Sequence, residues 1–594
     1  MDKHSPEEEF IFRISLVSSI LVGFGLAFIV SFLFLQTAVI SLIRLAIAFA
    51  LLVFFAVINY LLFFHILRQR LAAVLAHKPY AAGLCLLLPL LFLPIFFTPP
   101  DYPIHPLLRQ WTDVAVQYDV SAGSRPLSFS NSDVRLQMDK DVLDARAFRA
   151  VGIWKSANDP YILDPGMSAS LHWVGAASGT MLLTLQAPAA SGSVTIYWDQ
   201  TRSLFELSPG ASKQIVLTKK FTIPWGVVVL FFAAVYILSA WFLFLLVVLF
   251  DGKIKFRQWL DEAAGSRVLI ILFAIILAVV TVKLQLDSLN GGADSFIHGE
   301  QLARHAAVLT GQAPDPWQYR VLSEYVAEGF VRFFQLLKVR DAVGFGFISL
   351  RVLQNIGIFL LAFALYQKIS ISKGVAFTGF LLLAGAMKNA FYDNDLSFNT
   401  YFDLLFYLLA FIWVLDKKYF WIILLTAVAA FNRETSGLIP FLALAALVDE
   451  RSPLWKKLLP FILSLVVFAV IFLGLRFIYP NRPLYIPYEQ TPGFPMLIYN
   501  VTRSLTWDHL YYTLGFVPLI GLLFIFRWLR LWRYFFLVIC PAWFAVHFVL
   551  SVVGETRLFL VPQAVIFIPG VLFVLNYLLD LSPVDRRPLP SSGL

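Results

Sequence analysis

The chain has 594 residues, of which 59% are hydrophobic and only 14% are charged. Soluble domains average about a quarter charged residues, so this composition excludes an ordinary soluble protein and predicts an integral membrane protein. The formal net charge of +9 does not indicate nucleic-acid binding, because the basic residues form short clusters between apolar runs, as in the cytoplasmic loops of membrane proteins. Cys85 and Cys540 lie inside apolar runs, so we expect neither to form a disulfide or to bind a metal.

The apolar runs predict a polytopic α-helical membrane protein with about fourteen transmembrane helices. The first run is too long for a signal peptide and lacks a small-residue cleavage site, so we expect it to act as a membrane anchor. Residues 419–449 form either two short spans or one broken pair. The runs are 11–35, 39–66, 80–98, 223–250, 267–286, 343–366, 372–390, 401–416, 419–432, 436–449, 457–478, 509–526, 533–552 and 557–579.

The basic clusters predict the orientation of the chain. With a cytoplasmic N-terminus, seven consecutive inside segments carry Lys or Arg, in agreement with the positive-inside rule, and the C-terminus is cytoplasmic as well. These basic residues are Arg68, Arg70, Lys78, Lys253, Lys255, Arg257, Lys368, Lys373, Lys417, Lys418, Arg451, Lys456, Lys457, Arg527, Arg530, Arg533, Arg586 and Arg587.

Residues 99–222 differ from the rest, because short alternating runs such as MLLTLQA (181–187) and SVTIYWD (193–199) are separated by turn signals. This spacing predicts an inserted extracytoplasmic β-sandwich. The segment 193–209 weakly resembles jelly-roll modules of bacterial membrane glycan enzymes. The aromatic side chains of Trp173, Tyr197 and Trp198 could stack on sugar rings, but interior packing is the favoured interpretation.

These features divide the chain into five parts. The second half, from residue 267, carries a run of about ten helices whose first outer loop holds the candidate site. We expect N-terminal transmembrane helices (1–98), the β-sandwich (99–222), a transmembrane helix with a cytoplasmic linker (223–266), a helical core (267–579) and a disordered cytoplasmic tail (580–594).

The stretch 291–320 is the first outer loop of that core. Asp294 opens a predicted helix in which the spacings of His298 and His305 place all three side chains on roughly one face. We expect this helix to end at Thr310-Gly311, and the segment APDPW (313–317) to turn the chain into an amphipathic stretch over 319–335. An acidic residue such as Asp294 at the end of a membrane helix is energetically unfavourable and usually has a function, so we expect the active site here.

Polar residues gather in four loops that share the outer face in this topology. Buried charges need partners, and these loops supply both signs. The candidates are Asp294, His298, Glu300, His305 and Arg320 in the first loop, Lys388, Asp393, Asp395 and Asn399 in the second, Asn432, Arg433 and Glu434 in the third, and Glu555 and Arg557 in the fourth.

Each candidate also has a structural interpretation. Glu300 and Arg304 are spaced as a helix-surface ion pair, and the two histidines could serve loop packing. Arg320 could anchor its loop, and Asp393 and Asp395 could cap the next helix. Arg433 and Glu434 could pair with each other or with the fourth loop.

The helix and early acid of the first outer loop, followed by an amphipathic stretch and paired helices, resemble the GT-C superfamily of polytopic membrane glycosyltransferases. The likeness lies in ADSFIHGEQLA (293–303), QYRVLSEYV (318–326), the acidic DND (393–395) and FNRETS (431–436), and it covers about residues 267–579. Many members have a paired Asp-x-Asp or Glu-x-Asp in this loop, whereas here position 296 is Phe. A metal site is therefore in doubt, and Asp294 would act alone or with Asp393 or Asp395.

The resemblance implies inverting transfer of a sugar from a polyprenyl-phosphate donor to an extracytoplasmic glycan or lipid acceptor. Asp294 would be the general base, and Arg320, Arg433 and Arg557, followed by Lys388, would bind the phosphate. The expected substrate-binding residues also include His298, Asp393, Asp395, Glu434 and Glu555. Participation of Mg²⁺ or Mn²⁺ is left open, with Asp294, Asp393 or Asp395 as ligands if one binds. We expect a bacterial plasma membrane location, with membrane lipid as a partner and no nucleic acid.

Three other functions remain open from the sequence. A flippase of lipid-linked sugars would also carry charges within the membrane, although usually near the midplane and between repeats. A polymerase or ligase of envelope glycans would use similar arginines in an outer loop. A non-catalytic scaffold would use the β-sandwich for binding.

Overall fold

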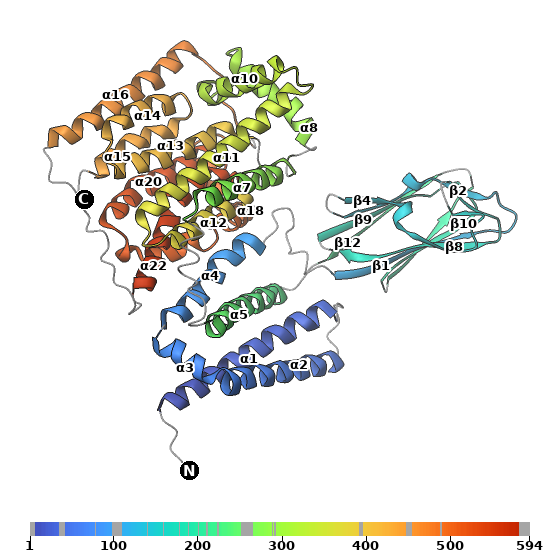
Figure 1. The fold of residues 1–594 in the computed structure, drawn as a ribbon. Coiled ribbons are helices and arrows are strands. Elements are labelled where there is room, and N and C mark those ends of the chain that lie inside the picture. Colours follow the sequence, from blue (N-terminus) through green and yellow to red (C-terminus); the bar gives the residue numbers. More distant parts are fainter. Residues whose placement is uncertain are drawn as a thin grey trace. The chain divides into compact units, whose positions relative to one another are not determined.

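The structure is a computed structural model of the chain, which divides into two compact units (Figure 1). The first unit comprises Met1–Leu71 and Asp101–Phe242, and the second comprises Ala72–Pro100 and Leu243–Leu594. The residues described are 6–34, 42–77, 79–97, 110–138, 141–157, 160–177, 179–187, 189–199, 201–209, 212–221, 225–250, 265–287, 289, 293–390, 396–446, 454–487 and 490–580.

The first unit contains the helices α1 (Pro6–Phe34) and α2 (Leu42–Tyr60), which pack against each other and are followed by the π-helical turn η1 (Leu61–Ile66). Gly23 permits this close packing, because a Cβ atom there would lie 2.7 Å from the carbonyl oxygen of Leu52. Asn59 Nδ2 donates a hydrogen bond to Ser19 Oγ at 3.1 Å in the buried contact. Helices α3 (Arg68–His77) and α5 (Trp225–Phe250) cross the boundary between the units.

The β domain of the first unit has a five-stranded sheet in the order β11-β10-β1-β8-β5 and a four-stranded sheet in the order β12-β9-β3-β4. A small sheet, β2-β7-β6, completes it. The strands are β1 (Gln110–Val120), β2 (Leu127–Phe129), β3 (Val134–Met138), β4 (Asp141–Asp144), β5 (Arg149–Gly152), β6 (Ser156–Ala157), β7 (Tyr161–Leu163), β8 (Ser168–Ala177), β9 (Gly179–Ala187), β10 (Gly192–Trp198), β11 (Thr201–Leu207) and β12 (Lys213–Phe221).

Alternating apolar residues from the two larger sheets share one core, in which Val116 of β1 and Leu183 of β9 are fully buried. The predicted β domain is therefore confirmed in the described part of 99–222. Trp198 lies in the core and donates from Nε1 to Thr112 Oγ1 at 3.0 Å, and Trp173 packs against it. Tyr197 is the exception among the three aromatic residues, because its side chain is exposed.

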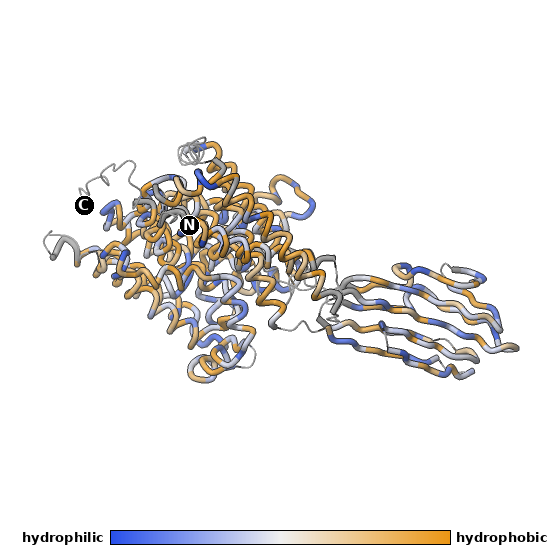
Figure 2. The backbone as a smooth tube through the Cα atoms, turned by 90° about the horizontal axis from the view of Figure 1, so that it is seen from below, coloured by the Kyte–Doolittle hydropathy of each residue, from blue (hydrophilic) through white to orange (hydrophobic). Residues whose placement is uncertain are grey.

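The second unit is helical, and its helices are coloured mainly hydrophobic in Figure 2, whereas hydrophobic and hydrophilic residues alternate along the strands. Its elements are α4 (Pro79–Phe97), α7 (Arg267–Asp287), α8 (Ala293–Phe296), η5 (Ile297–Gln301), α9 (Leu302–Leu309), η6 (Trp317–Tyr319), α10 (Val321–Leu336), α11 (Ala342–Ile369), α12 (Lys373–Asn389), α13 (Phe398–Leu415), α14 (Tyr419–Ala430), η7 (Glu434–Leu438), α15 (Ile439–Ala446), α16 (Leu454–Ile478), α17 (Phe494–Thr502), α18 (Ser504–Leu514), α19 (Val517–Leu523), η10 (Ile525–Arg527), α20 (Arg530–Leu550), η11 (Thr556–Phe559), α21 (Leu560–Pro562), η12 (Gln563–Phe567) and α22 (Ile568–Asp580).

Nine helices of the described residues are long and apolar enough to cross a membrane. They span Glu9–Val30, Leu45–Phe64, Gly226–Val248, Arg267–Leu286, Ala342–Ile369, Phe398–Leu415, Leu458–Ile478, Arg530–Leu550 and Thr556–Leu578. Three shorter apolar helices cover Ala82–Leu93, Tyr419–Ala430 and Glu434–Ala446. The prediction of a mostly helical chain with membrane-length apolar helices is confirmed.

The structure differs from the predicted elements in two places. The expected span over 509–526 is not one continuous helix, because the chain forms α18, α19 and η10 there. Gly515 breaks the helix with a φ of +57°, and Pro518 cannot donate a hydrogen bond to the preceding turn. Helix α4 belongs to the second unit rather than to a separate N-terminal group, because its Leu91 lies in the main core beside α12 and α22.

An ion pair joins the ends of two core helices. Lys368 in the last turn of α11 pairs with Asp416, just after α13, at 2.5 Å. Lys368 lies in a predicted cytoplasmic loop, and Asp416 is the last residue of the predicted span 401–416, at its cytoplasmic end. The hydrogen bonds that join the predicted outer loops lie at the other ends of α13 and α14, as described next.

Candidate functional site

The first outer loop forms a helix, a turn and an amphipathic helix, as the sequence predicts. α8, η5 and α9 follow one another over 293–309, and the helix ends at Thr310 before Gly311, whose φ is +70°. The chain then turns through η6 into α10, which begins directly after Arg320. The amphipathic stretch predicted over 319–335 is therefore a helix of the core unit.

His298 and His305 do not share a face, so that prediction is wrong. His305 is 3% exposed, whereas the side chain of His298 is 39% exposed and lies beside Asp341. His298 lies within the π-helical turn Ile297–Gln301, and His305 follows this turn. Because such a turn takes up one more residue than an α-helical turn, it rotates His305 away from the direction that regular spacing gives.

Hydrogen bonds join the first three of the predicted outer loops. Gln301 Oε1 accepts from the backbone N–H of Leu396 at 3.4 Å, which links the first loop to the second. Leu322 N donates to the carbonyl oxygen of Phe431 at 3.0 Å, which links the first to the third. Asn432 Nδ2 donates to the carbonyl oxygen of Asn399 at 2.7 Å, which links the third to the second. These three loops therefore form one structure at one end of the helices.

Arg320 and Glu434 form the ion pair at the centre of this structure, although they are 114 residues apart in sequence. Arg320 Nη2 lies 3.2 Å from Glu434 Oε2, and the two side chains are 14% and 29% exposed. Arg476, in the last turn of α16, lies 3.9 Å from the other oxygen of Glu434. The Nε atom of Arg320 is buried and has no hydrogen-bond partner among the described residues. One carboxylate is thus shared by two guanidinium groups.

The loop before η6 adds a further carboxylate. Asp315 and Tyr485 are joined by a backbone hydrogen bond of 2.8 Å, and Arg476 lies over the ring of Tyr319 at 4.3 Å from its centre. Partial burial raises the pKa of Asp315 above its ordinary value, the nearby charge of Glu434 adds to this, and Arg476 and Arg320 oppose it. A carboxyl group with a raised pKa beside arginines is suited to proton transfer.

Arg433 is almost fully buried behind this ion pair, at 5% exposure. Its Nη1 donates to Thr400 Oγ1 at 3.2 Å, and the charges of Arg320, Asp403, Glu434 and Arg557 all act on it. Asp403, in the first turns of α13, is fully buried, and its Oδ2 accepts from Thr435 Oγ1 at 2.7 Å. Its Oδ1 atom has no hydrogen-bond partner among the described residues, and Arg433 is the foremost positive charge that acts on it.

The fourth loop contributes a pair of its own. Arg557 Nη2 lies 2.8 Å from Glu555 Oε2, and the Arg557 side chain is buried. The positive charge of Arg557 acts electrostatically on Arg433 and on Arg351, a buried residue of α11. Arg351 lies over the ring of Tyr401 at 3.0 Å from its centre and donates from Nε to Gln285 Oε1 at 3.1 Å. Arginines from three separate segments, Arg320, Arg433 and Arg476, therefore act on the buried Asp403 or on the partly exposed Glu434.

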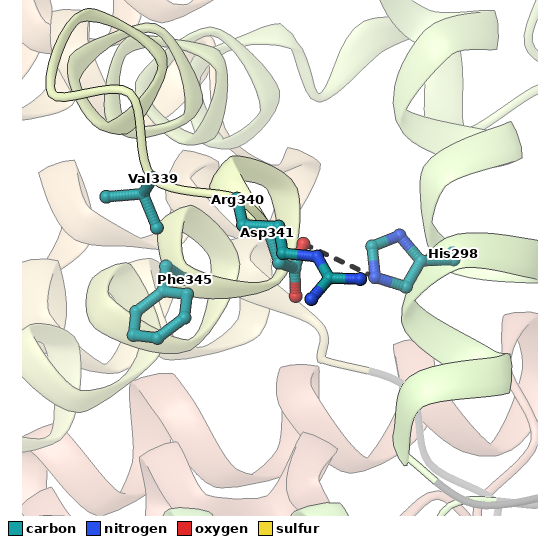
Figure 3. A pocket seen from close by; sticks show the side chains of 5 residues that line it. All are labelled: His298, Val339, Arg340, Asp341 and Phe345. Carbon is teal, nitrogen blue, oxygen red and sulfur yellow. Dashed lines mark ion pairs between the residues drawn. The ribbon is translucent and has the colours of Figure 1, made fainter.

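The other predicted residues lie elsewhere or outside the described residues. Lys388 is half-buried in the last turn of α12. His298 lines an open pocket of about 460 Å³ together with Val339, Arg340, Asp341 and Phe345 (Figure 3). The side chain of Asp294, which belongs to α8, and residues Asp393 and Asp395 lie outside the described part of the chain. Within that part, no three His, Cys, Asp or Glu side chains are grouped as a metal site.

Sequence reasoning missed Asp403, Arg476, Asp315 and Arg351. Three of them lie inside predicted apolar runs, where a charge is a strong sign of a function or a buried partner. The loops between the runs do not contain these three residues. Asp315 lies in the turn segment APDPW, where a polar residue is also expected for the turn alone.

His305 connects the first loop to α10. Its Nδ1 lies 2.7 Å from Glu324 and its Nε2 lies 3.2 Å from Glu328, and its ring packs edge-on against Phe347. Burial alone would lower the pKa of His305, but the hydrogen bonds and charges of the two glutamates outweigh burial and raise it above its ordinary value of 6.5. His305 therefore bridges two carboxylates of α10 and holds α9 against it.

We expect this contact to weaken as the pH rises. Because the folded pKa is raised, the bridge contributes its full stability below pH 6.5 and loses it as the pH passes through the folded pKa. Hydrogen exchange of α10, corrected for intrinsic rates, should be faster at about pH 9 than at about pH 6. The His305→Gln variant should lack this difference, and the same difference in that variant would contradict the assignment.

Comparisons with family models, with curated proteins and with solved structures found no significant match for this chain. The resemblance to the GT-C superfamily consequently stays a prediction that rests on the quoted segments.

Proposed function

We propose that the chain is a membrane glycosyltransferase that transfers a sugar from a polyprenyl-phosphate donor to a glycan or glycolipid acceptor. The observation that carries this proposal is the cluster of Arg320, Arg433 and Glu434, joined from loops far apart in sequence at one end of the apolar helices. Planar guanidinium groups bind phosphate oxygens through paired hydrogen bonds. A lipid phosphate at this end would meet several of them at once.

The reaction requires a base, a nucleophile and a stabilised leaving group. The acceptor hydroxyl oxygen forms a bond to the anomeric carbon, the bond from that carbon to the phosphate oxygen breaks, and the proton passes to a carboxylate. We assign the base to Asp294, which follows from the family resemblance. Arg320, Arg433 and Arg557 would stabilise the charge that develops on the departing polyprenyl phosphate.

The proposal includes the topology of the sequence analysis: about fourteen spans, both termini in the cytoplasm, and the active site and the β domain outside. The nine apolar helices and the Lys368–Asp416 pair at one helix end are consistent with it. The β domain, which we expect to be jelly-roll-like, would orient the acceptor. A divalent cation, Mg²⁺ or Mn²⁺, remains part of the proposal only if Asp294 acts with Asp393 or Asp395.

One observation favours a second candidate, a flippase of lipid-linked sugars. Arg351 and Asp403 are buried within the membrane-length helices α11 and α13, rather than at their ends alone. A flippase would move the donor across the bilayer without breaking the bond between sugar and phosphate.

The Asp294→Asn variant separates the two candidates. For a transferase, we expect about 10²–10⁴-fold slower transfer from a purified polyprenyl-phosphate sugar, since this is the usual contribution of a general base. The variant should keep the thermal stability of the wild type in the same detergent, and Asp113→Asn in the β domain is the matched control. Undiminished transfer by the Asp294→Asn protein would refute the base, and lipid-sugar movement without transfer by both proteins would favour the flippase.

A further inference from the structure

The proposed reaction does not involve the pocket beside His298. It lies between η5 and the turn that joins α10 to α11, and it is lined by His298, Val339, Arg340, Asp341 and Phe345 (Figure 3). His298 lies 3.4 Å from Asp341 of the same pocket, whereas Arg320 lies 3.2 Å from Glu434. The pocket therefore has its own set of polar groups, and it is open to the surroundings.

Asp341, the acidic residue of this pocket, already has two partners. Asp341 caps α11 by accepting from the N–H of Gly344 at 2.8 Å, and it lies 3.4 Å from His298 Nε2. Arg340 is exposed, and no ion pair or hydrogen bond of its side chain is found among the described residues. Its guanidinium group extends towards His298 in Figure 3. Arg340 and Asp341 carry opposite charges, and Asp341 already has partners in Gly344 and His298, so Arg340 is the group left to bind an anion.

Exposed apolar residues come directly before the pocket residues Val339 and Arg340 in the chain, and together with Phe345 they are called the apolar rim. Leu336 and Leu337, at the end of α10, are 82% and 58% exposed, and Phe345 of the pocket is 55% exposed. Phe345 contacts Phe334, whose ring contacts that of the exposed Phe333. Exposed side chains of this size next to a free cation are typical of a segment at a membrane interface, where the apolar groups enter the acyl region.

We propose that this pocket binds the phosphate of an anionic phospholipid. Arg340 would donate to the phosphate oxygens, and Leu336, Leu337 and Phe345 would pack against the acyl chains. The apolar rim is the reason to assign a lipid rather than a soluble phosphate, which would gain nothing from these side chains. The bound lipid would hold the C-terminal end of α10 at the headgroup layer, and the other end of α10 follows Arg320.

The test uses a fluorescent label at the rim. Cys85 and Cys540 are both buried, so a cysteine introduced by Leu337→Cys is the accessible thiol for an environment-sensitive dye. The full chain in neutral detergent micelles is titrated with phosphatidylglycerol, with diacylglycerol of the same chains, or with glycerol 3-phosphate. We expect a saturable signal with phosphatidylglycerol and no saturable signal with the other two.

Variants then assign the site. Arg340→Gln should weaken phosphatidylglycerol binding about tenfold or more, because it removes a charge-assisted hydrogen bond, and Arg340→Lys should recover part of the affinity. Arg332→Gln is the matched control, since Arg332 is an exposed arginine of α10 that pairs with Glu328. Equal losses in both Gln variants would show unspecific charge attraction and overturn the site. Saturation by glycerol 3-phosphate, or equal binding of diacylglycerol, would overturn the phospholipid assignment.

Discussion

Replacement of Arg433 by methionine is expected to abolish sugar transfer and to destabilise the core by about 3–5 kcal/mol. Arg433 is 5% exposed, and its charge compensates the fully buried Asp403, whose Oδ1 atom has no hydrogen-bond partner among the described residues. Without the guanidinium group, the carboxylate is left as an uncompensated buried charge. Thermal unfolding in detergent and the transfer assay measure the two effects.

A double variant distinguishes the structural role of Arg433 from its role in binding. Removing both charges with Arg433→Met and Asp403→Leu should restore much of the lost stability, because the two charges no longer need each other. Transfer should remain absent, because the phosphate ligand is still missing. Recovery of transfer in the stable double variant would contradict a phosphate-binding role, and Arg433 would then be only a partner of Asp403.

The second large effect is expected at Arg320. Its ion pair with Glu434 is partly exposed, so Arg320→Gln should change the stability by only about 1 kcal/mol or less. We expect the KM for the lipid-phosphate donor to rise about tenfold to a hundredfold, because a charge-assisted hydrogen bond to phosphate is lost. The kcat should change less if this arginine also binds the donor in the ground state. Steady-state kinetics with a purified donor separate the two constants.

Glu434 provides the control for this prediction. If Arg320 only positions Glu434, then Glu434→Gln should produce the same rise in KM as Arg320→Gln. If Arg320 binds the donor, Glu434→Gln should leave KM close to the wild-type value or lower it, since the variant frees two guanidinium groups, those of Arg320 and Arg476. The same rise in both variants would contradict direct donor binding.

Local patterns predicted much of the fold. The alternation of apolar residues and the turn signals located the β domain, because strand periodicity and turn chemistry are local properties of the chain. The helix, turn and amphipathic helix of 293–336 were predicted for the same reason. The break at Gly515 was not, because hydropathy over 509–526 is uniform and does not respond to one glycine followed by a proline two residues later.

The candidate site was predicted in part. The loops that hold Arg320, Arg433 and Glu434 could be collected on one face from the alternation of spans, and these residues do lie together. The pairing of Arg320 with Glu434 rather than Arg433 with Glu434 depends on how α10 meets the end of α14, which is a long-range contact. The π-helical turn at Ile297–Gln301 turns His305 away from the direction that regular α-helical spacing gives, and the amino-acid composition does not predict such a turn.

The most direct test of the account follows the donor itself. Purified chain in liposomes is supplied with a polyprenyl-phosphate sugar labelled in the sugar and a hydroxyl-bearing glycolipid acceptor, and both products are measured. We expect one polyprenyl phosphate to be released for each sugar that is joined to the acceptor. The Arg433→Met variant should form neither product. Movement of intact lipid-linked sugar across the bilayer, with no release of polyprenyl phosphate, would contradict this expectation.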